Sequence, residues 1–322
     1  MRVSVVIPTR NRAKLLARAV EGVVSQSHRD VELIVVDDGS SAQQAALNAR
    51  VAQAAAGSKY IPVASTDPLG SGPSRTRNIG IEASTGDLLA FCDDDDAWCD
   101  PAYLEAAVAA FAGQPTLDVF FGNQEAVAFG ATKYSTWQPK LESAVIMRRV
   151  QAGSTAGVSK AECLLSPGDF AHMNTCVFRR TLLDAIGGFD VDTRYCEDLD
   201  LFVRAVDRAR AIAYLRRTVA IHSVPDRNKR DNASTLLDAR AKAVTLHRIA
   251  TRLNALCDSI EATSYSRRLG AQACKDLARQ AAASSRRAEA ITWARLAGAW
   301  QRTSRWTIYT LLLRLRYALG SA

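Results

Sequence analysis

Four consecutive aspartates occupy positions 93–96, directly after the apolar run LLAFC at 88–92. A run of this length predicts a buried strand, so the carboxylates fall at its carboxyl end, where open α/β sheets bind their ligands. Adjacent carboxylates repel one another unless a cation compensates their charge. Because Mg²⁺ and Mn²⁺ accept oxygen ligands and keep positions open for water and phosphate oxygens, the cluster is a candidate site for either ion.

The same four acids have two simpler explanations, an exposed acidic turn and a set of helix N-caps. The next helix, however, has its own start signal in Asp100-Pro101, with Asp at the N-cap and Pro at the first helical position. Capping therefore does not require the cluster. On this segment alone, the metal site and the exposed turn both stay open.

The strand that carries the acids belongs to a repeating strand–helix pattern. Apolar, β-branched runs at 3–7 and 31–36 flank an amphipathic helical stretch at 12–26. Such a βαβ unit predicts a parallel sheet that is covered by helices on both faces. After the second run, Ser40-x-x-Gln43 is a capping box that predicts the start of the next helix.

Two later stretches narrow the class of protein. The glycine-bearing loop at 70–80 is neither G-x-G-x-x-G nor a Walker A loop with its lysine, which argues against a dinucleotide dehydrogenase and a P-loop enzyme. Between 122 and 167, Gly, Ser and Thr are frequent and no hydrophobic period persists. This pattern indicates loops and short strands that shape a substrate pocket.

Composition is that of an ordinary globular protein, with 48% hydrophobic and 23% charged residues in a chain of 322. The seven cysteines are scattered and form no C-x-x-C pair, which predicts reduced thiols in a cytosolic protein. The apolar run at 3–7 is cut off by Pro8 and is too short for a signal peptide. No uninterrupted apolar run is long enough to predict a transmembrane helix.

The last quarter of the chain differs from the rest in charge and pattern. Residues 237–322 carry 15 Lys and Arg against 5 Asp and Glu, whereas residues 1–236 have a net charge of −2. Segments rich in Ala, Leu and Arg predict helices at 236–256, 265–284, 288–302 and 303–319. Apolar side chains cover most of the last helix, so something must pack on it. The options are the other helices, a second subunit, or an anionic membrane surface. Nucleic acid is not expected, since no aromatic and basic recognition motif accompanies the charge.

Five segments together resemble the family 2 glycosyltransferases, a group of inverting enzymes that use nucleotide sugars. They are VSVVIPTRNR at 3–12, ELIVVDDGS at 32–40, SRTRNIGIEASTGDLLAFCDDDDAW at 74–98, IGGFD at 186–190 and EDLDLFVR at 197–204. The resemblance implies a GT-A fold, a Rossmann-like mixed α/β sheet flanked by helices. We expect this catalytic domain at residues 1–235 and a basic, all-helical extension at residues 236–322.

The resemblance also implies how the donor is held. A divalent cation, Mn²⁺ or Mg²⁺, is expected on Asp95, Asp93 and His222. The nucleobase is expected at Asp38 and Asp37, because a carboxylate can accept the imide N–H of uracil. The residues expected to bind the donor nucleotide are Thr9, Asp37, Asp38, Arg75, Arg77, Asp93 and Asp94.

Inversion requires one in-line attack by an acceptor hydroxyl, assisted by a carboxylate base on the face opposite the leaving group. The resemblance assigns this role to Asp198, with Glu197 beside it. The simpler explanation is that acids in a first helical turn compensate the helix dipole.

The expected function is metal-dependent, inverting transfer of a sugar from a nucleoside-diphosphate donor, a UDP-sugar first, to a hydroxyl of a glycan or lipid-linked acceptor. The expected location is the cytoplasm or the inner face of the membrane. Two alternatives are a nucleotidyltransferase on a similar sheet and a catalytically silent subunit that binds sugar nucleotides. A silent subunit has no chemical need for both a metal ligand and a base, which argues against it.

Overall fold

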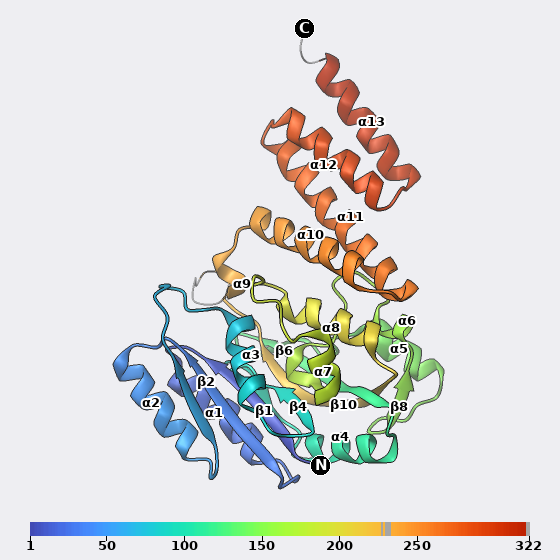
Figure 1. Ribbon diagram of the computed structural model, residues 1–322. Coiled ribbons are helices and arrows are strands. Elements are labelled where there is room, and N and C mark those ends of the chain that lie inside the picture. Colours follow the sequence, from blue (N-terminus) through green and yellow to red (C-terminus); the bar gives the residue numbers. More distant parts are fainter. Residues whose placement is uncertain (227, 229–232, 320–322) are drawn as a thin grey trace. The chain divides into compact units, whose positions relative to one another are not determined.

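The computed structural model describes residues 1–226, 228 and 233–319, which form two compact units (Figure 1). The sheet unit consists of Met1–Cys163 and Asp169–Asp226, and the helical unit of Leu164–Gly168 and Arg227–Ala322. The two units therefore divide after residue 226, whereas the domain boundary predicted from the sequence lies after residue 235.

Among the described residues, ten strands form one mixed sheet in the order β3-β2-β1-β4-β9-β6-β10-β5, with β7 on β6 and β8 on β10. The strands are β1 (Val3–Thr9), β2 (Val31–Asp38), β3 (Lys59–Val63), β4 (Leu88–Phe91), β5 (Ala97–Trp98), β6 (Leu117–Ala128), β7 (Ala131–Tyr134), β8 (Thr155–Val158), β9 (Cys176–Arg179) and β10 (Ala211–Ser223).

Parallel pairing of β1 with β2 and with β4 lines up the carboxyl ends of three strands. Val3 is opposite Val31 on one side and Leu88 on the other. The predicted parallel βαβ start is therefore confirmed. Because parallel strands end at the same edge, the polar residues that follow β1, β2 and β4 meet there.

Helices cover both faces of the sheet unit. On one face, Leu16 and Leu104 pack with Val5 and Ile7 in the buried core. On the other face, Gly80 lets α3 approach β1, since a Cβ at this position would lie 2.3 Å from the Val6 side chain. The helices are α1 (Ala13–Val24), α2 (Ala42–Gln53), α3 (Pro73–Ala83), α4 (Tyr103–Gly113), α5 (Pro139–Met147), α6 (Lys160–Cys163), α7 (Arg180–Ile186) and α8 (Glu197–Arg208), with a 3-10 turn at Met173–Thr175.

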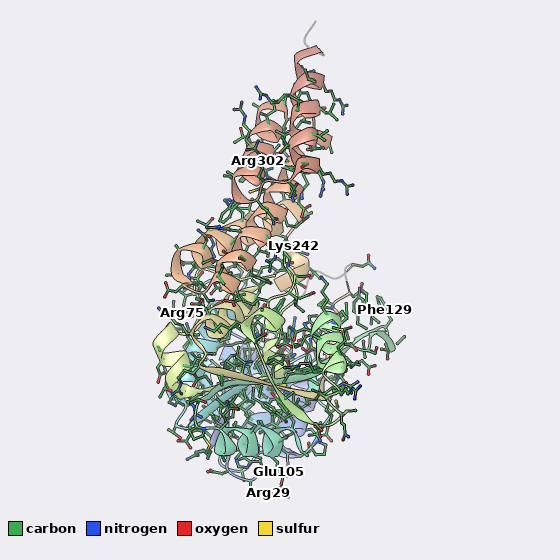
Figure 2. All side chains as sticks on the ribbon, turned by 90° about the vertical axis from the view of Figure 1, so that its right-hand side faces the viewer. Arg29, Arg75, Glu105, Phe129, Lys242 and Arg302 are labelled. Atoms are coloured by element: carbon green, nitrogen blue, oxygen red, sulfur yellow. The ribbon has the colours of Figure 1, made fainter. Side chains whose placement is uncertain are left out.

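Two local expectations are wrong. Ser41, not Ser40, caps α2 by accepting the Gln44 N–H, whereas the Ser40 hydroxyl accepts the Asn11 N–H at 2.8 Å. The stretch at 122–167 also contains the helix α5 and a continuation of β6 to Ala128. At the turn after β6, Phe129 is 87% exposed (Figure 2).

Among the described residues of the helical unit, five helices form the rest of its fold. Small side chains of α11 and α12, including Ala278 and Ala294, form a buried cluster with Trp306 and Leu313 of α13. The helices are α9 (Ala233–Leu236), α10 (Ala239–Leu256), α11 (Ile260–Ala283), α12 (Arg287–Trp300) and α13 (Ser304–Leu319). None of the helices in the described part of the chain is long and apolar enough to cross a membrane.

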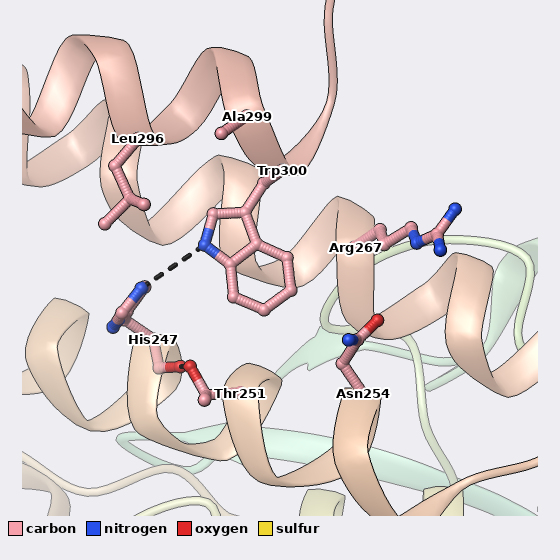
Figure 3. Close-up of a pocket in the computed structure, with 7 residues that line it drawn as sticks. All are labelled: His247, Thr251, Asn254, Arg267, Leu296, Ala299 and Trp300. Atoms are coloured by element: carbon pink, nitrogen blue, oxygen red, sulfur yellow. Dashed lines mark hydrogen bonds between the residues drawn. The ribbon is translucent and has the colours of Figure 1, made fainter.

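Trp300 holds three of these helices together (Figure 3). Its indole lies against α11 at Gly270, where a Cβ would come within 2.6 Å of the ring. The indole N–H donates to Nε2 of His247 on α10 at 3.3 Å. A surface cavity of about 670 Å³ opens beside the ring, lined also by Asn254 and Arg267. Only glycine at 270 leaves room for this packing.

Two glycine substitutions test the packing of Trp300. We expect Gly270→Ala to lower the free energy of unfolding by about 1–3 kcal/mol, because the added methyl overpacks the ring. Gly298→Ala is the matched control, since no atom lies within 4 Å of its Cβ position. It should raise the free energy of unfolding by up to about 1 kcal/mol, as alanine does in helix interiors. Urea unfolding followed by circular dichroism measures both, and equal effects of the two changes would contradict this packing.

Candidate active site

The carboxyl end of β4 carries the aspartate cluster, Asp93, Asp94, Asp95 and Asp96, in a turn before β5. Thr9, at the end of β1, donates to Asp94 Oδ2 at 2.8 Å. Arg12, just before α1, donates to Asp94 and to Asp95, each at 3.1 Å. The first strand and the chain after it therefore compensate one side of the cluster.

Arg77 of α3 joins the aspartate cluster to the first turn of α8. Its guanidinium is buried and donates from Nη1 to Glu197 Oε1 at 2.8 Å and from Nη2 to Asp93 Oδ1. Burial alone would lower the pKa of Arg77, but the carboxylates of Asp93 and Glu197 raise it above its ordinary value. The cation therefore stays charged and fixes the start of α8 beside the cluster.

Asn174 and His222 hold the other side of the cluster. The Asn174 side chain accepts the Asp93 N–H at 2.8 Å and donates to Asp96 Oδ2. Nδ1 of His222 lies 2.9 Å from the same Asp96 oxygen, and the Ser223 N–H donates to Asp96 Oδ1. Although burial acts in the opposite direction, Asp96 raises the pKa of His222 to about 9. Asp96 thus has hydrogen-bond contacts with three residues from outside the cluster.

Asp198 lies near the two histidines beside the cluster. Its Oδ2 lies 3.6 Å from Nε2 of His172, and the His172 ring is 4.9 Å from the ring of His222. Trp137 packs edge-on against both imidazoles. Burial raises the pKa of Asp198 to about 6, although the charge of Arg77 acts against this shift. The structure therefore brings Asp198 to the aspartate cluster through two contacts, Arg77 with Glu197 and His172 with His222.

One group of side chains has the chemistry of a cation site. Donor atoms of Asp96, His172 and His222 lie within 4.8 Å of one another. The Nδ1 atom of His172 is buried and has no hydrogen-bond partner. Burial and repulsion by Asp96, Asp94 and Asp93 also raise the pKa of Asp95 to about 8. Two imidazoles and a carboxylate beside these repelling acids fit a divalent cation.

Of the three predicted metal ligands, His222 belongs to the group of Asp96, His172 and His222. Asp93 and Asp95 border it, but Asp93 Oδ1 accepts from Arg77 and Asp95 Oδ2 accepts from Arg12.

The predicted nucleobase residues also support nearby loops. Asp37 is buried and accepts from Ser40 N, from Asn48 Nδ2 and from the Tyr60 hydroxyl, whose distance is 2.7 Å. Asp38 accepts the N–H groups of Ser71 and Gly72 at 2.7 and 2.9 Å. Asp38 thus fixes the turn into α3 and with it the helix that carries Arg77. Arg75, on the same helix, is exposed.

The sequence did not predict that His172, Asn174 and Trp137 belong to the site, or that Arg12 donates to Asp94 and Asp95. The chain has only four histidines, so His172 could have been singled out as a rare titratable residue. It stands two residues before Asn174 at the entry to β9. Nothing in the sequence pairs either residue with the aspartate cluster.

The family model described as glycosyl transferase family 2 matches residues 4–158. This segment, a little under half of the chain, is therefore similar to that family. The match runs from β1 to β8 and includes Thr9, Arg77 and the aspartate cluster, but ends before His172 and Asp198. An uncharacterised glycosyltransferase of Nostoc sp. is 31% identical over 160 residues, which are 48% of this chain and 47% of the relative. The chain therefore spans about half the length of that relative.

Solved glycosyltransferases share the fold along most of the chain. A crystal structure of S. aureus TarS in complex with UDP-GlcNAc has a TM-score of 0.67 at 18% identity, covering 93% of this chain and 80% of that one. The mannosyltransferase PcManGT from Pyrobaculum calidifontis, in complex with GDP-Man and Mn²⁺, has a TM-score of 0.57 at 19% identity, covering 97% and 84%. The predicted GT-A fold with C-terminal helices is confirmed.

Substitution of Arg77 tests the link between the cluster and α8. We expect Arg77→Met to lower the free energy of unfolding by about 3–5 kcal/mol, because it removes the countercharge of the buried Glu197 and of the half-buried Asp93. Adding Glu197→Gln should recover part of this loss by removing one of the two carboxylates. Arg75→Met, on the exposed side of the same helix, should change the free energy by less than about 0.5 kcal/mol.

Urea unfolding of the four proteins measures these differences. If Arg77→Met and Arg75→Met were equally stable, the buried ion pairs would not support the site.

Proposed function

We propose that this protein acts as a family 2 glycosyltransferase and transfers a sugar from a nucleoside-diphosphate donor to an acceptor hydroxyl with inversion at the anomeric carbon. One observation carries the proposal: Asp198 and the aspartate cluster, about a hundred residues apart in the chain, are brought together by the contacts of Arg77 with Asp93 and Glu197 and of His172 with Asp198. Inverting transfer needs this pairing, since a base and a leaving-group site must flank the same carbon.

Asp198 is the proposed base. Its carboxylate is mostly buried, and its pKa near 6 leaves it ionised at neutral pH yet more basic than an exposed aspartate. Glu197 is a weaker candidate, because Arg77 holds its carboxylate in a buried ion pair. We assign Glu197 a positioning role, in which it keeps the first turn of α8 against α3.

The proposed donor is a nucleotide sugar. TarS and PcManGT, which share the fold, were crystallised with UDP-GlcNAc and GDP-Man, and this supports the donor class. We propose that the nucleobase lies at Asp38 and Asp37, with uracil favoured because a carboxylate matches its imide N–H. The other proposed donor contacts are Thr9, Arg75, Arg77, Asp93 and Asp94.

The proposed cofactor is Mn²⁺ or Mg²⁺. The residues that would hold it are Asp96, His172 and His222, beside the sequence-predicted Asp93 and Asp95. The Mn²⁺ in the PcManGT complex supports this choice. When bound, the cation would neutralise the charge that develops on the departing diphosphate.

For the acceptor, we propose a hydroxyl of a glycan or a lipid-linked glycan, as in the synthesis of a cell-envelope polysaccharide. The sequence allows two alternative external partners of the C-terminal helices, a second copy of the chain and an anionic membrane surface. The exposed side chains of α13 favour the membrane, which agrees with a site of action at the inner face of the membrane.

Asp198→Asn tests the proposed base. We expect sugar transfer to fall by a factor of about 10² to 10⁴, because the amide cannot accept the hydroxyl proton. Donor binding should persist, because Asp198 is not among the proposed donor contacts. Release of nucleoside diphosphate measures the rate, and calorimetry with UDP and Mn²⁺ measures binding. Asp184→Asn is the control, since it changes an exposed acid on α7.

Full activity of Asp198→Asn would remove Asp198 from the reaction. Release of pyrophosphate by the unaltered protein would instead identify a nucleotidyltransferase. Binding of sugar nucleotides without any turnover, in the presence of glycan and lipid-linked acceptors, would identify a silent subunit.

A further inference from the structure

The outer face of α13 is a stripe of large apolar side chains. Ile308, Leu311, Leu312 and Leu315 follow the i, i+3, i+4, i+7 spacing of one helix face, and between 49% and 59% of each residue is exposed. The opposite face is buried, since Trp306 and Leu313 pack into the cluster with α11 and α12. About half of the stripe is therefore left uncovered by the helical unit, and a contiguous apolar surface of this kind marks an interaction site.

Arginines border the stripe on both sides. At 100° per residue, Arg305 and Arg316 lie along one edge of the stripe, and Arg314 lies along the other. All three are exposed, and α13 contains no Asp or Glu. An apolar face between cationic edges is the pattern of a helix that lies in the plane of an anionic bilayer, where arginine stems reach along the apolar zone to the headgroups.

A cavity next to the stripe adds a specific site for an anion. It has a volume of about 300 Å³ and lies between the end of α12 and α13. Arg295, Arg302 and Arg314 line it, and Leu311 of the stripe forms part of its wall. Figure 2 labels Arg302 in the connection between the two helices. Arginine is the side chain best suited to bind the oxygens of a phosphate group, and three arginines form part of the wall of this one cavity. The adjoining leucine continues from that cavity onto the apolar stripe.

We propose that α13 and the end of α12 bind an anionic phospholipid surface. One lipid phosphate occupies the cavity lined by Arg295, Arg302 and Arg314, while the stripe enters the boundary between headgroups and acyl chains. This site lies within the helical unit and does not rest on the proposed sugar transfer, so the two proposals can fail separately.

A second copy of the chain fits this surface less well. If two stripes packed together, the arginines at their edges would approach one another, and α13 offers no acidic side chain to compensate them. An anionic bilayer satisfies the apolar face and the cationic edges at once.

Co-sedimentation of the full chain with vesicles tests the proposal. We expect binding to vesicles of phosphatidylcholine mixed with phosphatidylglycerol, weaker binding as salt is raised, and no binding to pure phosphatidylcholine. Leu312→Ser should weaken binding about tenfold by removing buried apolar area. Arg302→Gln combined with Arg314→Gln should weaken it by at least about tenfold. All three residues are exposed, so the fold should persist in circular dichroism.

Leu47→Ser and Arg50→Gln on α2 are matched controls, because they change exposed residues of the same types in the sheet unit and should leave binding unaltered. Equal binding to neutral and anionic vesicles, or equal effects of the control and α13 variants, would overturn the proposal. So would a dimer in light scattering that Leu312→Ser dissociates, since the stripe would then be a contact between copies. Displacement from vesicles by inorganic phosphate, but not by chloride at equal ionic strength, would show that the cavity takes free phosphate instead.

Discussion

Four carboxylates that follow one another along the chain repel, and burying them at the end of β4 requires compensation from elsewhere in the sheet unit. Arg12 approaches from the start of α1, Arg77 from α3, and His222 from the end of β10. Each partner belongs to a different segment, so the cluster can form only when the sheet has its native strand order. The electrostatic constraint therefore ties the site to the topology of the fold.

The residues that compensate the charge of the cluster also position the proposed base. Arg77 contacts both Asp93 and Glu197, and this brings the next residue, Asp198, to the cluster. His172 meets Asp198 on one side and His222 on the other. Positive groups that stabilise the acids thus also set the distance between the proposed base and the proposed diphosphate site. A single deletion in this network should disturb stability and catalysis together.

Features that depend on residues close together in the sequence could be predicted, whereas contacts between residues far apart in the sequence could not. Strands and helices near the N-terminus depend on hydrophobic period, so the βαβ start and the acids at the end of β4 could be predicted. The role of Asn174 could not, because its three hydrogen bonds reach residues 76 to 81 positions away. Ser40 and Ser41 are equally good capping residues by type, and contacts of Ser40 with Asn11 and Asn48 decided between them. The stripe on α13 was visible as an apolar helix, but only its packing shows which side stays exposed.

The central claim is that the acids near residues 38, 95 and 198 surround one cation and one activated sugar. A crystal structure with Mn²⁺ and UDP, in which anomalous scattering locates the metal, tests this claim most directly. The account predicts one strong Mn²⁺ peak among Asp96, His172 and His222, with the diphosphate against it and Asp198 beside the sugar. A Mn²⁺–UDP complex bound away from the end of β4, in a protein that transfers sugar, would contradict it.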